Sequence, residues 1–265
     1  MTTQPRSLKY EYALFVEQEI EAYKESIPRG VLLRIGDEAV AVLEAAQQLA
    51  LTELLLTAEV DRIIRGRVRI PAYRTWCRRR TKALQEFRRP ERWGLRPDGA
   101  VARAVQRAAE SGGAHVLVAG SAGENPAVFL AANGCAVTAI DSTEEVLERV
   151  IHAAVEVGIG GRVRGFVGDL ASWAPDLPLD TVVCAAAAFA GLTPTERAEA
   201  IAILQGATTR GGMHIVESPG EAAGGCAEGD DEALSLDELA ARYDGWTISV
   251  ERGETDATFL ATKVA

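Results

Sequence analysis

A doubly wound α/β domain behind a helical front segment is the fold class that the sequence predicts. From residue 100 onward, short apolar runs alternate with helix-like segments, a rhythm typical of a mostly parallel sheet covered by helices. The last two apolar runs are joined by a short turn, so they must pair antiparallel, because a parallel pair needs a long crossover. The first ninety residues carry apolar side chains at helical spacing. We therefore expect a helical region at 1–95 and the α/β domain at 96–265.

The front segment is predicted to consist of successive helices. Residues 7–27 form the first, with these apolar residues at spacings of three and four: Leu8, Phe15, Val16, Ile20, Tyr23 and Ile27. Pro28 to Gly30 break the pattern, and we place the next helix at 36–49. Its predicted inward residues are Ala39, Val40, Val42, Leu43 and Ala46. Residues 51–64 continue it or form a third helix, and Pro71 suits the first turn of a helix at 71–88.

The α/β part is predicted from alternating strand and helix patterns. A linker at 93–99 leads into it. The predicted strands are 115–119, 135–140, 163–167, 181–185 and 213–216, followed by the antiparallel pair 246–250 and 257–264. The predicted helices are 100–111, 125–133, 143–157, 194–206 and 235–243. A sheet of this kind holds its ligands beyond the carboxyl ends of its parallel strands.

Charge and cysteine usage limit the classes of partner. The 265 residues carry 28 Lys and Arg against 38 Asp and Glu, for a net charge of −10, which disfavours nucleic acid as a partner. The four cysteines show no CxxC pairing, so we expect neither a zinc site nor a disulfide framework, and no metal. No signal peptide pattern and no membrane-spanning apolar run is visible. The prediction is a soluble, cytoplasmic protein.

Three features predict a nucleoside-like cofactor site at one edge of the sheet. Small residues fill the loop Gly120–Asn125 after the first strand, where a ligand can approach the backbone. Asp141 ends the second strand, where a carboxylate can accept hydrogen bonds from ribose hydroxyls, although it also suits a helix N-cap. Asp169 follows the third strand in the same way, and its alternative role is that of a turn residue.

The run Val116–Asp141, VLVAGSAGENPAVFLAANGCAVTAID, resembles the first cofactor motif of class I S-adenosylmethionine-dependent methyltransferases. It is most similar to the thiopurine and tellurite-resistance type, whose pattern is VLV-x-GCGxG, a helix ending in LA-x-x-G, and V-T-A-x-D. The strand LDTVVCA, the glycine pair at 211–212 and the closing hairpin also match this family. The resemblance covers about residues 100–265 and implies a Rossmann-like fold with S-adenosylmethionine as cofactor.

The resemblance implies a set of cofactor-binding residues. They are Gly120, Ser121, Ala122, Gly123, Asp141, Ser142, Asp169, Leu170 and Cys184, with Asp169 in VGDL as the adenine-contacting acid. The chain departs from the family at three positions. Ala122 and Glu124 replace glycines of the motif, and Val118 stands where many members carry an acid. Glutamate at 124 would crowd or repel the carboxylate of the cofactor unless the loop takes another path or a cation of the basic segment compensates. A methyltransferase-fold binding protein without activity is therefore a second hypothesis.

Few side chains qualify as a catalytic base for methyl transfer. Glu217 closes the fifth strand on the cofactor side, whereas His214 lies inside that strand, where a structural role is the more common one. No Asn/Asp-Pro-Pro-aromatic motif follows the fourth strand, which argues against the usual amide methylation. Alanines and Phe189 stand there instead and suit an apolar small-molecule acceptor, or simply belong to the sheet core.

A basic segment separates the two acidic parts of the chain. Residues 62–107 hold 15 basic and 3 acidic residues, a net charge of +12, while residues 108–265 hold 8 basic and 24 acidic residues, a net charge of −16. Three readings are open: docking of the segment onto the acidic domain, a lid with substrate contacts, or RNA binding through 62–96. The expected substrate contacts of a lid are Tyr73, Arg74, Trp76, Trp93 and Phe189.

Two further alternatives follow from these patterns. A homodimer through the front helices is one, because the helix at 7–27 offers an amphipathic face. A nicotinamide oxidoreductase is the other, because an acid after the second strand is common to both folds, but the glycine loop lacks GxGxxG and the closing hairpin does not fit. The favoured hypothesis is a small-molecule methyltransferase.

Overall fold

The computed structural model describes residues 7–46, 53–110, 113–120, 125–219, 235–253 and 256–264. The chain divides into two compact units, Met1–Thr81 and Lys82–Ala265. The division lies ahead of the predicted boundary at 95. Phe87 and Trp93 explain the difference, because both are buried in the core of the second unit.

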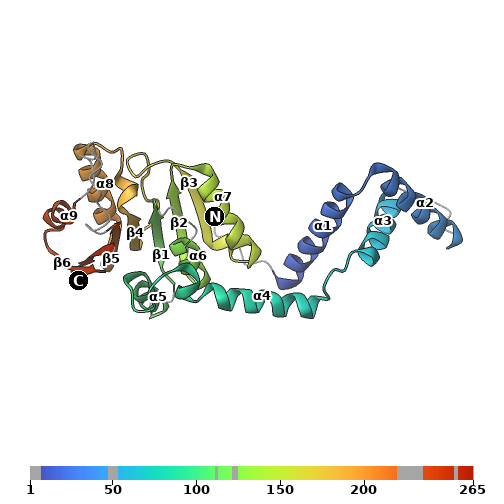
Figure 1. Ribbon diagram of the computed structural model, residues 1–265, viewed down its shortest axis with the longest axis horizontal. Helices are drawn as coiled ribbons and strands as arrows, with labels where there is room; N and C mark the ends of the chain where they lie inside the picture. The colour runs from blue at the N-terminus through green and yellow to red at the C-terminus, as the bar shows by residue number, and fades with distance from the viewer. Residues whose placement is uncertain are drawn as a thin grey trace. The chain divides into compact units, whose positions relative to one another are not determined.

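The first unit is built from helices α1 (Leu8–Ser26), α2 (Arg29–Ala45), α3 (Glu53–Arg67) and the first half of α4 (Tyr73–Phe87) (Figure 1). Six buried residues form its core: Val16, Ile20, Ile35, Ala39, Ile63 and Ile64. The Lys24 ammonium lies 2.7 Å from the Asp61 carboxylate and joins α1 to α3. This core is small, so each of its six members matters for the packing of three helices.

Two expectations for the first unit are wrong. The second helix begins at Arg29 and not at 36, because Pro28 takes an N-cap position, where a residue without a backbone N–H is tolerated. Val42 and Ala46 are exposed, although the sequence predicts that they face inward. In α2 the buried positions are Ile35 and Ala39, one turn apart, so the buried stripe is narrower than the apolar pattern implies.

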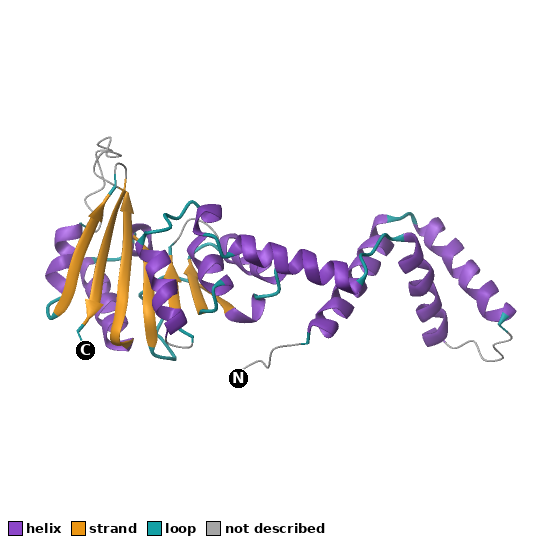
Figure 2. Cartoon of the chain, turned by 90° about the horizontal axis from the view of Figure 1, so that it is seen from below, coloured by secondary structure: helices purple, strands orange, loops and turns teal. Residues whose placement is uncertain are grey.

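The second unit holds a seven-stranded sheet in the order β3-β2-β1-β4-β5-β7-β6 (Figure 2). The strands are β1 (His115–Ala119), β2 (Ala136–Asp141), β3 (Val163–Val167), β4 (Leu179–Ala185), β5 (Thr208–Pro219), β6 (Trp246–Arg252) and β7 (Asp256–Lys263). The first five are parallel, whereas β7 is antiparallel to both β5 and β6. The doubly wound sheet with a closing antiparallel pair is therefore confirmed.

Helices cover both faces of this sheet (Figure 1). On one face lie α5 (Ala100–Glu110), α6 (Asn125–Ala132) and α7 (Glu144–Glu156), and on the other α8 (Pro194–Ala207) and α9 (Leu236–Arg242). Three short 3₁₀ turns complete the unit: η1 (Pro90–Trp93), η2 (Gly160–Arg162) and η3 (Ala186–Phe189). Strand residues alternate between the two cores, as the pleat requires.

Two local predictions need correction. Residues 93–99 were expected to be a linker, but Trp93 is buried, and its indole N–H donates to the Phe87 carbonyl at 2.9 Å. The fifth strand was expected at 213–216, but β5 begins at Thr208. Its pairing with β4 shifts between the Leu179–Thr208 pair and the Thr181–Met213 pair. The residues between Thr208 and Met213 form an irregularity in β5, and Gly211 lies among them with φ +75°. The pair Gly211–Gly212 therefore marks a bulge inside β5 and not the start of the strand.

Candidate functional site at the carboxyl edge of the sheet

The carboxyl ends of β1, β2 and β3 are tied together by backbone hydrogen bonds. The Gly120 N–H donates to the Ile140 carbonyl at 3.1 Å, which fixes the end of β1 against β2. The Gly168 N–H donates to the Asp141 carbonyl at 2.9 Å, which fixes the end of β3 against β2. The structure therefore brings together the three positions that the sequence singled out at this edge: Gly120, Asp141 and the segment that carries Asp169.

Gly120 occupies a position that only glycine can fill. Its φ is +64°, and a Cβ built on it would lie 2.6 Å from the N, Cα and Cβ atoms of Ala188 in η3. Such a contact with backbone atoms cannot be relieved by a rotamer change. The glycine lets the end of β1 pass directly against the segment after β4, and this close approach shapes the edge at its centre.

Asp141 uses one of its two carboxylate oxygens locally. Its Oδ1 accepts a hydrogen bond from the Thr143 N–H at 2.9 Å, ahead of α7. Among the described residues, nothing donates to its other oxygen. The local role and the ligand role proposed from the sequence are thus compatible, because each needs a different oxygen.

Asp169 sits in a tight turn with Ser172. Its Oδ1 accepts from the Ser172 N–H at 2.7 Å, and the Ser172 hydroxyl donates to the Asp169 carbonyl at 3.0 Å. Hydrogen bonding by the Ser172 hydroxyl, and then by its N–H, holds the pKa of Asp169 below the ordinary value. The carboxylate is therefore ionised and exposed, and it acts as a hydrogen-bond acceptor. Sequence reasoning missed Ser172, although a serine three residues after an aspartate is a recognisable turn signal.

The other predicted cofactor residues fall into three groups. Ser121, Ala122 and Gly123 lie outside the described residues, as does Glu124. Ser142 is exposed beside Asp141. Leu170 and Cys184 are buried in the core between the sheet and α8, and burial raises the pKa of the Cys184 thiol to about 12. Cys184 is therefore a neutral core residue, and its side chain does not reach a ligand at the edge.

Glu217 is half-buried near the end of β5, opposite Ala185 of β4 and Thr258 of β7. Burial raises its pKa, and the negative charge of Asp256 raises it further. Strands β1 and β4 separate β5 from β2, so about 14 Å of sheet lies between Glu217 and Asp141. A carboxyl group with a raised pKa at the ligand-binding edge of a sheet is a candidate for proton transfer.

His214, the other candidate base predicted from the sequence, lies in the core and not at the edge. Its side chain is only 1% exposed, in the core under α8 and α9. Nδ1 lies 2.7 Å from the Tyr243 hydroxyl, and Nε2 lies 2.7 Å from the Thr208 hydroxyl. Desolvation lowers the pKa of His214 to about 3. A neutral imidazole with both nitrogens occupied inside the core cannot exchange protons with a substrate.

The predicted substrate contacts belong to both units of the chain. Phe189 and Trp93 are buried core residues of the second unit, so neither presents a surface to a substrate. Tyr73 and Trp76 belong to an aromatic cluster of the first unit, where both rings pack against Tyr12. Arg74 is exposed on α4.

The basic segment is only partly neutralised by acidic side chains within the described residues. Within the first unit, Arg67 pairs with Glu38, and Arg80 pairs with Glu11. Within the second unit, Arg96 lies 3.4 Å from Glu251, which also binds Arg103 of α5. Four basic side chains of α4 have no acidic partner in the described parts of the chain: Arg74, Arg78, Arg79 and Lys82.

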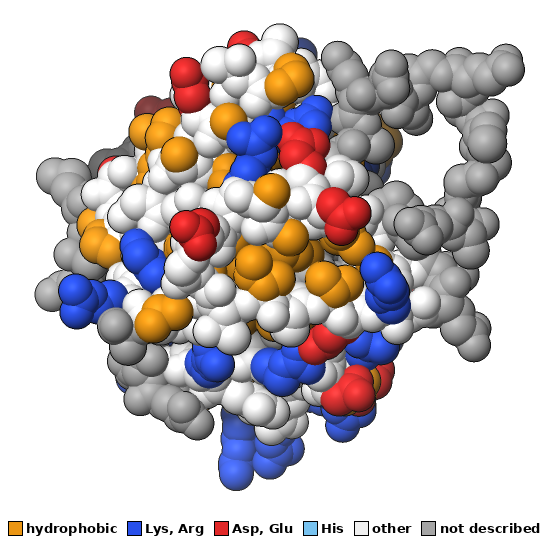
Figure 3. Space-filling view, turned by 90° about the vertical axis from the view of Figure 1, so that its left-hand side faces the viewer, with side chains coloured by type: hydrophobic (Ala, Val, Ile, Leu, Met, Phe, Trp, Pro, Cys, Tyr) orange, Lys and Arg blue, Asp and Glu red, His pale blue; other side chains and the backbone are white. Residues whose placement is uncertain are grey.

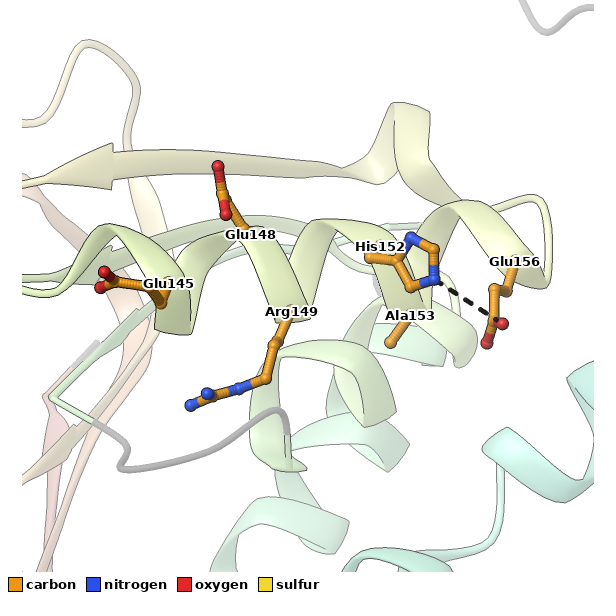
Figure 4. Close-up of a pocket in the computed structure, with 6 residues that line it drawn as sticks. All are labelled: Glu145, Glu148, Arg149, His152, Ala153 and Glu156. Atoms are coloured by element: carbon orange, nitrogen blue, oxygen red, sulfur yellow. Dashed lines mark ion pairs between the residues drawn. The ribbon is translucent and has the colours of Figure 1, made fainter. Parts of the chain in front are cut away.

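A hollow on α7 was not expected from the sequence. Figure 4 shows its lining of Glu145, Glu148, Arg149, His152, Ala153 and Glu156 along one side of the helix. The His152 Nε2 atom lies 3.8 Å from a Glu156 carboxylate oxygen, and both side chains are mostly exposed. Within the described ranges, no group of three or more His, Cys, Asp or Glu is placed to bind a metal ion.

Solved structures with this arrangement of strands and helices are methyltransferases. TehB from Haemophilus influenzae superposes with a TM-score of 0.51 at 16% sequence identity, over 65% of this chain and 65% of that protein. An S-adenosylmethionine-dependent methyltransferase from Clostridium acetobutylicum superposes with a TM-score of 0.50 at 11% identity, over 62% of this chain and 91% of that one. The chain has the class I methyltransferase fold. The fold resemblance inferred from Val116–Asp141 and the closing hairpin is thereby confirmed.

The match to the class I methyltransferase fold is one of structure. No family model matches the sequence, and no curated protein matches it. The matched region spans a little under two thirds of TehB. No helix in the described part of the chain is long and apolar enough to cross a membrane.

Proposed function

We propose that the chain is an S-adenosylmethionine-dependent methyltransferase that acts on a small-molecule acceptor. The observation that carries the proposal is the carboxyl edge of the sheet, where backbone hydrogen bonds hold Gly120, Asp141 and the Asp169 segment together. The fold shared with a protein named as an S-adenosylmethionine-dependent methyltransferase supports it. Ligands of open α/β sheets bind at this edge.

The residues present fit a nucleoside cofactor. The free oxygen of Asp141 would accept from ribose hydroxyls, and the ionised Asp169 would accept from an adenine amine. Gly120 lets the end of β1 lie directly against Ala188 of η3, and any other residue would push these two segments of the edge apart. When bound, S-adenosylmethionine would supply an electrophilic methyl group. The chain would supply position and exclusion of water.

The end of β4 and the end of β5 are proposed to face the acceptor. Ala185, Ala186 and Ala188 are half-buried there and give an apolar surface with few hydrogen-bonding groups. Glu217 is the one titratable candidate that the structure leaves from the two proposed, and its raised pKa suits a group that takes a proton from the acceptor. An acceptor with an ionisable oxygen or nitrogen would need such a group, whereas a thiolate acceptor would not.

An activity assay tests this proposal. We expect the purified protein to convert S-adenosylmethionine to S-adenosylhomocysteine when it is given the small-molecule fraction of a cell extract. Glu217→Gln should lower kcat at least tenfold and leave cofactor binding unchanged, because glutamine keeps the shape but cannot accept the proton. Glu148→Gln on the exposed face of α7 is the matched control and should change neither. Full turnover by Glu217→Gln would refute its assigned role.

An RNA acceptor is the second candidate, and one observation favours it. Arg74, Arg78 and Lys82 follow at intervals of four residues on α4, so they share one helix face, and no acidic partner is described for them. A salt-dependent gel shift with structured RNA, together with methyl transfer to that RNA, would replace the small-molecule proposal. A shift that disappears at about 150 mM salt, without methyl transfer, would leave the small-molecule proposal in place.

A binding protein without activity is the third candidate, and the assay separates it from the others. Cofactor binding without methyl transfer to small molecules or to RNA would favour this candidate, whereas methyl transfer to either would exclude it. The roles of residues 1–95 as cap, lid or dimerisation region stay predictions. So does the cytoplasmic location, which the unpaired thiols of Cys77, Cys135 and Cys184 support.

A further inference from the structure

Strand β6 forms one edge of the seven-stranded sheet and is unusually regular for an edge. It pairs with β7 through seven consecutive residue pairs, from Trp246–Lys263 to Arg252–Ala257, without a bulge. It contains no proline. Among the described residues, no other strand pairs with its free side. Soluble proteins usually protect such an edge with bulges, prolines or inward charges, because an unprotected edge pairs with other chains.

The hairpin turn shows which backbone groups of β6 point away from the sheet. The Gly253 N–H donates to the Asp256 carbonyl at 2.8 Å, so Gly253 bonds to β7. Bonding residues alternate along an antiparallel pair, so Glu251, Ser249 and Thr247 also bond to β7. The N–H and C=O groups of Val250 and Ile248 therefore point to the free edge. The Trp246 N–H agrees with this pattern, because it donates to the Tyr243 carbonyl and not to β7.

The side chains at this edge are apolar and accessible. Ile248 is 37% exposed and Val250 is 40% exposed, and both lie on the same side of the strand as Trp246. Figure 3 views the molecule from the β6 end and shows apolar side chains gathered between charged ones on this face. The edge thus offers both unpaired backbone groups and apolar side chains.

We propose that β6 is a homodimer interface, in which a second copy adds its own β6 antiparallel and extends the sheet across a twofold axis. A register with Ser249 opposite the partner's Ser249 pairs Ile248 with the partner's Val250. In this register the N–H and C=O groups of Ile248 and of the partner's Val250, which point to the free edge, lie opposite each other and can form hydrogen bonds. It is isologous, so each contact occurs twice.

The same register matches side-chain chemistry along the whole strand. Ile248 and the partner's Val250 form an apolar cross-strand pair. Trp246 lies opposite the partner's Arg252, an arrangement that allows a cation–π contact. Thr247 lies opposite the partner's Glu251, so no two like charges meet. The carboxylate of Glu251 is already paired with Arg96 and Arg103 in its own chain.

The other edge of the sheet is a weaker candidate. Strand β3 also exposes apolar side chains, with Phe166 at 37% and Val167 at 53%. It is shorter, with five residues. Its free side would present Val163 to Val167 only, and a register centred on Gly165 would place Arg164 opposite the partner's Phe166, so fewer cross-strand pairs would form than at β6. The β3 edge therefore serves as the internal comparison.

Sedimentation of the full-length protein tests the proposal. We expect a mass of twice the 28.2 kDa of one chain at micromolar concentration. Val250→Pro removes an outward N–H and no bond to β7, so the variant should fold and its dimer should dissociate at least tenfold more readily. Ile248→Lys should do the same by placing a charge in the apolar pair, whereas Val167→Lys on β3 should leave the dimer intact. A monomer at all concentrations, or a dimer insensitive to both β6 variants, would overturn the proposal.

A cross-link tests the register. Residues facing each other at a non-hydrogen-bonded position have Cα atoms about 4.5 Å apart, which a disulfide can span. Ser249→Cys should therefore form an intermolecular disulfide under mild oxidation, seen as a band of doubled mass that reduction removes. Thr247→Cys, equally exposed but opposite the partner's Glu251, is the matched control and should not. Equal cross-linking by both, or by the parent chain through its own cysteines, would overturn the register.

Discussion

At the scale of single residues, Gly120 and Gly191 share a left-handed backbone but meet different surroundings. Their φ values are +64° and +76°. A Cβ on Gly191 would meet nothing within 4 Å, whereas a Cβ on Gly120 would overlap the backbone of Ala188. We predict that Gly191→Ala lowers the free energy of unfolding by about 1 kcal/mol. Gly120→Ala should lower it by about 3 kcal/mol, because steric overlap adds to the same backbone strain.

Urea unfolding followed by circular dichroism measures both variants. Equal losses of stability would show that the end of β1 does not pass against η3 as described. A larger loss for Gly120→Ala, together with weaker cofactor binding, would link the close approach to the site.

His214 forms a hydrogen-bonded chain whose direction follows from its end. The Thr208 hydroxyl donates to the Leu204 carbonyl at 2.7 Å, because a carbonyl can only accept. Thr208 therefore accepts from Nε2–H of His214, and the unprotonated Nδ1 accepts from the Tyr243 hydroxyl. Protonation of this imidazole would break the bond to Tyr243. These hydrogen bonds satisfy both ring nitrogens of His214 and so allow a histidine to be buried in a core strand.

The pH dependence of stability should report this histidine. The pKa of His214 is lowered from 6.5 to about 3 in the folded state, so the unfolded chain binds its proton first. The stability is therefore fully present above about pH 6.5 and is lost as the pH falls toward 3. Because one pKa unit corresponds to about 1.4 kcal/mol, the loss should amount to several kcal/mol.

A His214→Gln variant is the comparison for that titration. It should be less stable than the parent at neutral pH but should lose less stability between pH 6.5 and 4. Parallel stability curves for the two proteins would contradict the buried neutral state.

At the scale of elements, α8 has the most complete cap among the described helices. The Thr193 hydroxyl accepts from the Glu196 N–H at 3.3 Å, and the Glu196 carboxylate accepts from the Thr193 N–H at 2.9 Å. Pro194 occupies the first turn. We predict that Thr193→Ala lowers the free energy of unfolding by about 1 kcal/mol, because the Glu196 N–H loses its acceptor and the Glu196 carboxylate loses the hydrogen bond from the Thr193 hydroxyl.

Thr195→Ala is the control for the cap, since Thr195 is exposed and makes no cap contact. Thermal unfolding of the two variants should differ by several degrees, with Thr193→Ala the lower. Indistinguishable midpoints would mean that the cap contributes nothing.

The elements also show how far the sequence predicts this fold. The parallel strands, their order of appearance and the closing hairpin follow from local patterns of apolar residues and turns. The bulge in β5 does not, because it depends on how β5 pairs with β4 across the sheet. The early start of α2 was missed because Pro28 to Gly30 have two uses, as a break and as a helix start, and local sequence does not choose between them.

For the candidate site, the sequence predicts positions better than side-chain roles. Asp141 and Asp169 lie at the carboxyl edge because the ends of parallel strands meet there, whereas their roles toward a ligand stay predictions. The burial of Phe189 and Trp93 was not foreseen, because it depends on contacts between segments far apart in the chain. Whether Glu124 admits the cofactor lies outside the described residues.

At the scale of the whole molecule, the net charge of −10 conceals two opposed parts. The second unit carries most of the negative charge, while helix α4 carries basic residues without described acidic partners. Arg96 and Arg103 both bind Glu251, so part of the basic segment balances the acidic domain from within the second unit. Charge alone therefore does not identify an RNA partner, and the fold points to the carboxyl edge of the sheet instead.

Calorimetry with S-adenosylhomocysteine tests the central claim, that this edge binds the cofactor. We predict one binding site per chain for the parent protein. Asp141→Ala should weaken binding at least tenfold, because the ribose hydroxyls lose their acceptor. Asp244→Ala, an exposed acid that lies before β6 at the opposite edge of the sheet, should bind like the parent. Absence of binding by the parent at millimolar ligand, or equal binding by Asp141→Ala, would contradict the claim.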